Sequence, residues 1–191
     1  MAGHAQPFLT PEQYLHIERS ADSRSEYYDG RMYAMAGGSQ DHQRLKDNLA
    51  FELRRRFGKR RCEIGTSDLR VSVSHNGLYT YPDVFVICGE SKLLDGHKDT
   101  LLNPVLIAEI LLPSTERYDR VFKFSQYRQI ESLQEYVIVS QSEPRVEVQR
   151  READGAWSLT EFVGMNAVCR FASVDCEVPL AELYTNITFE S

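Results

Sequence analysis

The chain has 191 residues, of which 42% are hydrophobic and 26% are charged, and this composition is ordinary for a soluble globular protein. The length favours a single domain, residues 1–191, with a core large enough to fold without disulfides or metals. A net charge of −6 argues against a general nucleic-acid binder, because phosphate contacts need clustered lysines and arginines.

Targeting and cysteine patterns argue against further classes of protein. Residues 1–13 have neither the basic nor the apolar segment of a secretory signal, and no run of eighteen apolar residues could span a membrane. We therefore expect a cytoplasmic protein with no membrane partner. The four cysteines form no C-x-x-C pair, so no zinc site is predicted. Cys62 and Cys88 lie in predicted strands and are expected to be reduced core thiols.

The N-terminal third predicts a short helix, a hairpin and a long helix. Residues 10–13 (TPEQ) are typical of a helix start, with Thr at the N-cap, Pro at the first helical position and Gln three residues after the cap. Asp29 and Gly30 tolerate positive φ and separate SEYY from RMYAMA, which predicts a hairpin. Residues 40–57 place leucine at every fourth position before Phe57 and predict an amphipathic helix.

The middle of the chain predicts two adjacent strands and a second long helix. Residues 68–74 alternate apolar and polar side chains and turn through an Asn-Gly pair into the stretch TYPDVFVICG. After the central apolar run described below, Ser114 or Thr115 could cap a helix that continues to about Ile130.

The C-terminal third predicts mainly strands. Residues 135–140 form one strand, and residues 145–150 and 156–163 form a hairpin across an Asp-Gly turn. A short helix is expected around residues 179–184. The order of elements indicates an α/β or α+β fold with a central mixed sheet, flanking helices and an N-terminal helix and hairpin.

One charged residue interrupts the most apolar stretch of the chain, residues 105–112 (VLIAEILL). Such a run is typical of a strand in a sheet that is covered on both faces. Glu109 stands in it and, by strand alternation, shares a face with Val105, Ile107 and Leu111. A buried carboxylate is costly unless a cation, hydrogen bonds or a metal compensates its charge. The sequence therefore predicts a partner group directed at Glu109.

A second carboxylate, Asp83, interrupts the apolar stretch YPDVFVI. Acidic side chains on neighbouring strands repel each other unless a cation lies between them, and oxygen ligands suit Mg²⁺ or Mn²⁺. Asp83 and Glu109 are thus candidate metal ligands. The alternative is that each carboxylate is solvated at a strand edge or paired with an arginine.

The predicted helix after Glu109 places Asp119, Lys123 and Tyr127 four residues apart and therefore on one face. Because this helix follows the strand directly, the long side chain of Lys123 could reach back to Glu109. The alternative is an exposed Asp119–Lys123 ion pair, worth about 0.3 to 0.5 kcal/mol.

These residues support a resemblance. Pro82-Asp83, followed on the next strand by Glu109, resembles the PD-(D/E)XK signature of metal-dependent nucleases. More closely, the sequence resembles the Uma-type putative restriction endonucleases over most of its length. The features that match as a set are Glu26 with Asp29-Gly30, His42, residues 67–70 (SDLR), residues 81–83 (YPD), Glu109 with residues 113–115 (PST), Asp119, Lys123, Tyr127 and Glu135-Tyr136.

The resemblance implies a restriction-endonuclease-like fold and the Mg²⁺-dependent or Mn²⁺-dependent hydrolysis of DNA phosphodiester bonds. Asp83, Glu109 and the backbone carbonyl of Ile110 would hold the metal, which polarises the phosphate and lowers the pKa of a bound water. Lys123 would orient that water or stabilise the charge of the transition state. Glu26 would be an additional acidic catalytic residue, although an exposed acid in a hairpin is an equally valid interpretation.

The sequence departs from the superfamily signature at two positions. Leu111 stands where the lysine of E-x-K should be, and Lys123 from the following helix would replace that lysine. Leu112 stands where relatives have serine before Pro-Ser-Thr, and it is expected to affect helix entry more than chemistry.

Two further features of the sequence each have two interpretations, and one further expectation follows from the implied function. His42 could contact phosphate, but a capping or packing histidine is the more frequent case. Residues 54–61 (RRRFGKRR) hold six of the 22 basic residues, and they could contact the DNA backbone or complement a helix C-terminus. A homodimer is expected, because cutting both strands calls for two sites related by a two-fold axis.

Two other functions compete with the nuclease. A catalytically silent domain of the same fold, which binds a nucleic acid or a protein, is favoured by Leu111 and by the acidic net charge. The position of the Lys123 ammonium discriminates between the two. A metal-free hydrolase with Asp83 and Glu109 as acid and base would need one raised carboxyl pKa and a cleft rimmed with aromatics, for which Tyr79 and Tyr81 are insufficient.

Overall fold

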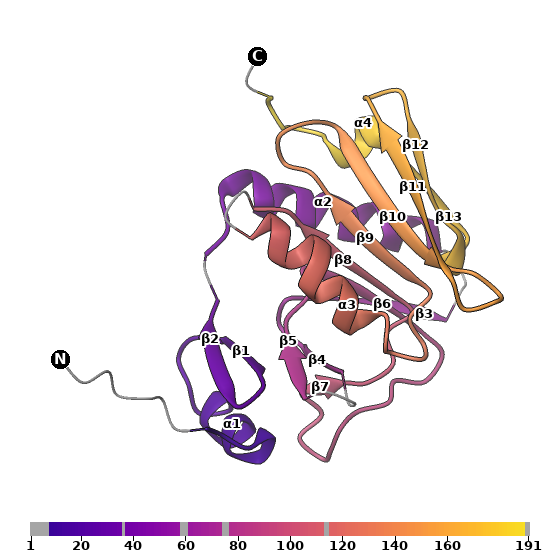
Figure 1. The fold of residues 1–191 in the computed structure, drawn as a ribbon. Helices are drawn as coiled ribbons and strands as arrows, with labels where there is room; N and C mark the ends of the chain where they lie inside the picture. Colours follow the sequence, from indigo (N-terminus) through magenta and orange to yellow (C-terminus); the bar gives the residue numbers. More distant parts are fainter. Residues whose placement is uncertain (1–7, 36, 58–60, 74–76, 113–114, 190–191) are drawn as a thin grey trace.

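The computed structural model describes residues 8–35, 37–57, 61–73, 77–112 and 115–189. Its main elements are a five-stranded sheet and a six-stranded sheet with helices around them, and a small two-stranded sheet lies near the C-terminus (Figure 1). The mixed α/β class with a central mixed sheet is therefore confirmed.

The elements, in chain order, are α1 (Pro11–Glu18), β1 (Ser25–Tyr28), β2 (Arg31–Ala34), α2 (Gln40–Phe57), β3 (Cys62–Thr66), β4 (Arg70–Val73), β5 (Leu78–Thr80), β6 (Val84–Cys88), β7 (Thr100–Leu101), β8 (Leu106–Ile110), the π-helical turn η1 (Tyr118–Lys123), α3 (Phe124–Tyr127), β9 (Glu135–Val139), β10 (Arg145–Arg151), β11 (Trp157–Val163), β12 (Val168–Phe171), the 3₁₀ turn η2 (Ala172–Val174), β13 (Cys176–Pro179) and α4 (Leu180–Leu183).

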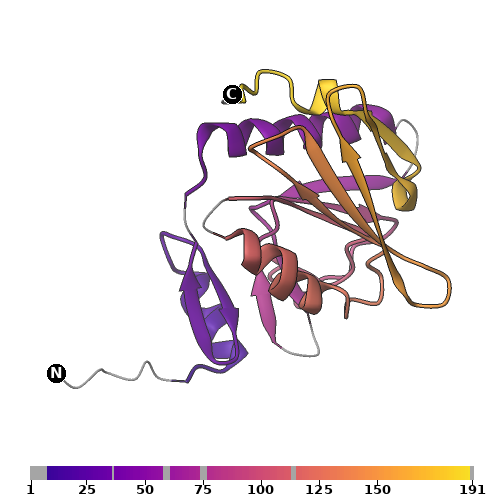
Figure 2. The same cartoon turned by 45° about the horizontal axis from the view of Figure 1, so that its top comes forward.

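The six-stranded sheet has the order β11-β10-β9-β8-β6-β3. It is mixed, because β8 and β9 run parallel whereas every other pair of neighbouring strands in it is antiparallel. Helix α2 crosses one face of this sheet, and η1 with α3 lies on the opposite face (Figure 2). Covering on both faces explains why the central strand β8 is apolar throughout except at Glu109.

Strand alternation divides β8 between two hydrophobic cores. Leu106, Ala108 and Ile110 pack with the leucines of α2, whereas Ile107 packs with residues near α3. Glu109 is therefore on the α3 side of the sheet, as the sequence pattern predicted. This places its carboxylate under the helix that contains Lys123.

The N-terminal helix and hairpin are confirmed. Thr10 forms a capping box at the start of α1, and Asp29 and Gly30 have the positive φ values of 45° and 77° that join β1 to β2. Tyr27 in β1 pairs with Tyr79 in β5, so the hairpin extends the five-stranded sheet, which has the order β2-β1-β5-β4-β7. This pairing makes the N-terminal hairpin part of the same sheet as β4, β5 and β7.

The structure differs from the predicted elements at several points. The stretch TYPDVFVICG is not one strand, because pairing stops around Pro82, which has no N–H to donate, and β5 and β6 belong to different sheets. Strand β7, the β12–β13 hairpin and η2 were not predicted. Among the described residues, no helix has both the length and the apolar character needed to cross a bilayer.

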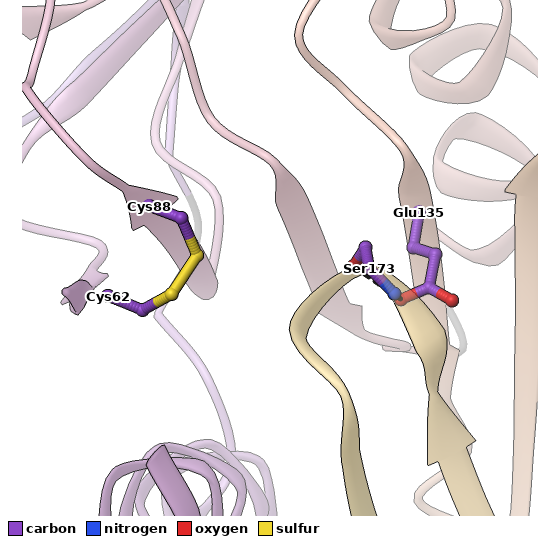
Figure 3. The surroundings of a disulfide bond; sticks show 4 residues. All are labelled: Cys62, Cys88, Glu135 and Ser173. Atoms are coloured by element: carbon purple, nitrogen blue, oxygen red, sulfur yellow. Dashed lines mark hydrogen bonds between the residues drawn. A yellow bond between two sulfur atoms is a disulfide. The ribbon is translucent and has the colours of Figure 1, made fainter. Parts of the chain in front are cut away.

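The prediction of reduced thiols at Cys62 and Cys88 is wrong, because the two residues form a disulfide (Figure 3). They lie directly opposite each other on the antiparallel strands β3 and β6, with Cα atoms 4.1 Å apart. Only a strand register that places the two cysteines opposite each other brings their Cα atoms close enough for a bridge. The register was not visible in the sequence.

Residue Glu135, also drawn in Figure 3, has a structural role. Its carboxylate accepts hydrogen bonds from the backbone N–H groups of Ala172 and Ser173, at 2.8 and 3.1 Å, and from the Ser173 hydroxyl at 2.6 Å. These donors belong to η2, which follows β12. Glu135 therefore fixes the C-terminal segment to the start of β9.

Reduction of the disulfide should lower the free energy of unfolding by about 3 kcal/mol, because the bridge closes a loop with a sequence separation of 26 and so restricts the unfolded chain. Urea unfolding with and without reductant measures this difference. A Cys62→Ser and Cys88→Ser double variant should not respond to reductant. Four titratable thiols in the unfolded, unreduced protein, instead of two, would contradict the bridge.

Candidate active site

A cavity of about 590 Å³ lies where the N-terminal hairpin, the start of α2, the ends of β6 and β8 and the turn η1 meet. The described residues that line it include all four side chains that the sequence suggested as catalytic, together with several aromatic rings. They are Glu26, Tyr28, Tyr33, Ala34, Met35, Gly38, His42, Tyr81, Asp83, Glu109, Ile110, Leu112, Thr115, Tyr118, Asp119, Phe122 and Lys123.

Asp83 and Glu109 lie side by side at this cavity. Asp83 immediately precedes β6, which pairs with β8 from Val84 onward. The Ile110 N–H donates to Asp83 Oδ2 at 2.8 Å, and the Asp83 N–H donates to Glu109 Oε2 at 3.4 Å. Because the N–H and C=O of one strand residue point to the same neighbour, the Ile110 carbonyl also faces the Asp83 side. Glu109 is 3% exposed and pairs with Lys123, and Asp83 contacts His42, so the alternative that each carboxylate is solvated at a strand edge or paired with an arginine is wrong.

Lys123 lies at the centre of a carboxylate cluster. Its Nζ is 3.0 Å from Glu109 Oε1, 3.3 Å from Glu26 Oε1 and 3.3 Å from Asp119 Oδ1. Only 7% of the residue is exposed. The alternative of an exposed Asp119–Lys123 pair is therefore wrong, and the predicted reach toward Glu109 is observed.

The backbone around Lys123 is a π-helical turn and not the α-helix that the sequence predicted. A π turn has more residues per turn, so positions four and five apart lie nearly above one another, and Tyr118, Asp119 and Lys123 can all face the cluster. Thr115, one of the two expected caps, instead donates its hydroxyl to Asp119 Oδ2 at 2.8 Å. Ser114 lies outside the described residues. The Tyr136 hydroxyl donates to the Asp119 carbonyl at 3.0 Å and ties the turn to β9.

Glu26 reaches the cluster from the N-terminal hairpin. Its carboxylate accepts hydrogen bonds from the Thr80 hydroxyl, on the neighbouring strand β5, and from the Tyr118 hydroxyl at 3.0 Å. It is 8% exposed. The interpretation of Glu26 as an exposed hairpin acid is therefore wrong.

The cavity has more negative than positive charge. Burial raises the pKa of Glu109 to about 8, although Lys123 acts to lower it. Burial also raises the pKa of Asp119. Burial alone would lower the pKa of Lys123, but attraction by Glu109 and Glu26 outweighs it and raises this pKa well above its ordinary value. Lys123 is thus a stable ammonium. It offsets only part of the negative charge of the surrounding carboxylates, and a proton or another cation would offset more of it.

His42 holds Asp83 in place. Its N–H at the start of α2 donates to the Ser39 hydroxyl at 3.0 Å, so Ser39 is the residue that caps the helix. The ring Nε2 lies 2.9 Å from Asp83 Oδ1 and donates to it when the carboxyl group is ionised. Gly38 allows the chain to pass close to this ring, because a Cβ there would lie 2.7 Å from His42 Cδ2. His42 therefore faces the cavity and orients a carboxylate.

Arg54, Arg55 and Arg56, from the basic stretch 54–61, lie in the last turn of α2. His42 is 15 residues before Phe57, the last residue of this helix, so at 1.5 Å per residue the helix C-terminus is about 22 Å from His42. Arg55 and Arg56 form ion pairs with Glu52 and Glu182. Residues 58–60 lie outside the described part of the chain. The described arginines of the cluster therefore do not line the cavity.

Comparisons with known proteins place this geometry in a family. The sequence profile of Uma2, described as "Putative restriction endonuclease", matches residues 11–175. The chain belongs to the Uma2 family. Two uncharacterized proteins of Synechocystis sp. (strain ATCC 27184 / PCC 6803 / Kazusa) are similar to it: sll1609 is 40% identical over 86% of this chain and 93% of its own length, and slr1290 is 32% identical over 96% and 95%.

A solved structure has the same fold. It is the crystal structure of a protein from Anabaena variabilis ATCC 29413, described as a "putative nuclease belonging to DUF820". The TM-score is 0.77 with 16% sequence identity, over 94% of this chain and 99% of the other. This similarity establishes the fold of the Uma2 chain. At 16% identity it says nothing about the chemistry, which must be argued from the residues of the site.

The donor atoms in the Uma2 cavity fit a hard divalent cation. Two carboxylates on adjacent strands and a backbone carbonyl supply oxygen atoms, and the surplus negative charge favours a cation. In the part of the chain that the structure describes, no group of three or more His, Cys, Asp and Glu side chains forms a ready metal cage. Asp83, Glu109 and the Ile110 carbonyl would therefore need water or substrate oxygens to complete the coordination.

Sequence reasoning named Tyr81 and Thr115 but missed other hydroxyl and aromatic residues of the cavity, such as Tyr118 and Tyr28. Tyr118 precedes Lys123 by five residues, which is one turn of a π-helix but not of the α-helix that we assumed. Tyr28 lies two residues after Glu26 in β1 and therefore shares its face. That alternation was a usable signal once Glu26 was considered a site residue.

The raised pKa of Glu109 predicts a pH dependence of stability. Between its ordinary value of 4.5 and about 8, the folded protein retains a proton that the unfolded chain releases. The free energy of unfolding should therefore fall as pH rises through this window, by at most about 1.4 kcal/mol per pH unit from this group. Glu109→Gln should remove this component, so the variant should gain stability relative to wild type between pH 5 and pH 8.

Urea unfolding at several pH values measures the two slopes. Glu131→Gln, at an exposed glutamate, is the matched control and should leave the slope unchanged. Parallel pH profiles for wild type and Glu109→Gln would show that Glu109 is ionised throughout this range in the folded protein.

Proposed function

We propose that this Uma2 family protein is a metal-dependent endonuclease that hydrolyses phosphodiester bonds of DNA. The observation that supports this most directly is the position of the Lys123 ammonium, 3.0 Å from Glu109 Oε1 and in the same cavity as Asp83. The cavity thus contains two carboxylates and a lysine, although Leu111 occupies the position where the nuclease signature has its lysine.

The proposed roles follow from chemistry. Asp83, Glu109 and the Ile110 carbonyl would hold Mg²⁺ or Mn²⁺, which when bound supplies a Lewis acid for the phosphate and a water with a lowered pKa. Lys123 has a pKa well above its ordinary value, so it acts as a charge and hydrogen-bond donor and not as a base. A fixed ammonium stabilises the negative charge that develops on the phosphate.

Three neighbours position these groups. The His42 ring orients Asp83, the Tyr127 hydroxyl donates to Glu109 Oε1 at 2.9 Å, and Glu26 holds the ammonium from the side of the hairpin. Glu26 therefore acts in this proposal through Lys123. We also propose that two copies of the chain assemble into a homodimer, because two sites related by a two-fold axis can cut both strands of a duplex.

The silent-domain alternative has an observation in its favour. Lys123 is surrounded by three carboxylates, so without a bound cation the cavity repels a phosphodiester. In that case the protein would bind a partner without cleaving it. Metal binding separates the two readings, since only the nuclease requires it.

The metal-free hydrolase also gains support, because Glu109 has a raised pKa and aromatic rings line the cavity. The low accessibility of Glu109 argues against the metal-free hydrolase. This residue is 3% exposed, and its Oε1 already accepts hydrogen bonds from Lys123 and Tyr127. A general acid must reach the oxygen that it protonates. Activity that survives chelation by EDTA would favour this alternative over the nuclease.

Asp83→Asn and Lys123→Met should each lower metal-dependent cleavage of DNA by at least about 100-fold, since removing a single transition-state donor commonly costs that much. The assay is nicking of plasmid and cleavage of single-stranded DNA with Mg²⁺ or Mn²⁺. Lys92→Met, which changes a lysine outside the cavity, is the control and should retain wild-type activity. Circular dichroism establishes that each variant is folded.

Calorimetric titration with Mn²⁺ accompanies the cleavage assay. We expect Asp83→Asn to weaken Mn²⁺ binding, whereas Lys123→Met removes a competing cation and should retain it. Wild-type protein that neither cleaves DNA nor binds Mn²⁺ would overturn the nuclease proposal and leave the silent binding domain as the better account.

A further inference from the structure

One wall of the cavity is aromatic, and the proposed chemistry does not use it. Tyr28 and Tyr33 come from the N-terminal hairpin, Tyr118 and Phe122 come from η1, and Met35 follows β2. These side chains lie beside the carboxylate cluster because the hairpin also carries Glu26 and η1 also carries Asp119 and Lys123. We call these five residues the aromatic wall.

The hairpin directs its aromatic side chains into the cavity by simple alternation. Glu26 in β1 pairs directly with Tyr33 in β2, so the two share one face of the hairpin, and Tyr28 lies on that same face two residues after Glu26. Tyr27 and Met32 are on the other face, where they pack toward α1. The Glu26 carboxylate and the rings of Tyr28 and Tyr33 therefore face the cavity from the same side of the hairpin.

The rings on η1 are held in fixed positions. Tyr118 and Phe122 stack with ring centroids 4.9 Å apart, and Tyr28 meets Phe122 edge-on, also at 4.9 Å. The hydroxyl of Tyr118 donates to Glu26, which fixes the stack relative to the cluster. In contrast, Tyr33 is 47% exposed and Met35 is 36% exposed. The wall thus combines rigid rings with open apolar surface.

The remaining composition of the cavity is informative about its occupant. Of the described residues that line it, Lys123 alone is a lysine or arginine, and carboxylates already surround it. A surface that follows the backbone of a nucleic acid, whether duplex or single strand, needs several such cations, so this cavity does not track a backbone. Flat, uncharged rings instead suit the faces of nucleobases, which stack on aromatic side chains irrespective of sequence.

We infer that the aromatic wall is a stacking subsite for the base of an unpaired nucleotide next to the phosphate at the carboxylate cluster. This inference rests on the proposed function and narrows its substrate to single-stranded DNA or to a duplex with an extruded base. The cavity, at about 590 Å³, has the size of a pocket for a small ligand such as one base. The bases of a paired duplex are stacked inside the helix, so a base must be unpaired or extruded to enter this cavity.

Binding is tested with Ca²⁺ in place of Mg²⁺ or Mn²⁺, so that a hard cation offsets the carboxylates, and with a single-stranded DNA dodecamer that contains one 2-aminopurine. Stacking quenches the fluorescence of this base, so wild-type protein should quench it on binding. Tyr33→Ala should weaken binding about tenfold, as expected for the loss of one stacking partner. Tyr33→Phe should restore it because the ring is retained. Phe51→Ala, at a ring that is 62% exposed on α2 outside the cavity, should have no effect.

Cleavage with Mn²⁺ is then compared for the same strand alone, in a fully paired duplex, and in a duplex that leaves one base unpaired. We expect the strand and the unpaired site to be cut at least tenfold faster than the paired duplex. Equal cleavage of the paired duplex, with no response to Tyr33→Ala, would overturn the subsite and leave the nuclease intact. Quenching that depends on Tyr33, without cleavage of any substrate, would support the subsite and refute the nuclease.

Discussion

The contacts of the Lys123 ammonium join three parts of the chain that are distant in sequence. Glu26 belongs to β1, Glu109 to β8 and Asp119 to the same turn as the lysine. Without the ammonium, three carboxylates that are each less than one-tenth exposed would repel one another. Well-packed apolar residues can often replace a buried ionic cluster without loss of stability. The fold alone therefore does not require this cluster to be ionic, which is consistent with the proposed function.

Neutral donors complete this arrangement without cancelling its charge. Hydroxyl groups of Thr80 and Tyr118 donate to Glu26, that of Tyr127 donates to Glu109, and that of Thr115 donates to Asp119. Hydrogen bonds of this kind reduce the cost of burying each carboxylate but leave the total charge negative. The negative charge that remains supports the proposal that this cavity binds a divalent cation.

The sequence predicted those parts of the site that depend on local periodicity. Glu109 was evident as a charge in an apolar strand, and Lys123 as a residue on one helix face with Asp119. The position of Glu26 was not predictable, because it depends on β1 pairing with β5 in a different sheet. The Cys62–Cys88 disulfide depends on strand register in the same way. Local patterns determine which face a side chain occupies, but pairing across the sheet determines what that face meets.

The break at residues 81–83 explains why the site forms where it does. Here the chain leaves the five-stranded sheet at β5 and enters the six-stranded sheet at β6, and Asp83 is the last residue before the new pairing begins. A proline at this point prevents one continuous strand, so the ends of two sheets meet at an open edge. Side chains from both sheets then converge on a single cavity. The anionic cluster and the aromatic wall are consequently adjacent, as a phosphate and its own base are within one nucleotide.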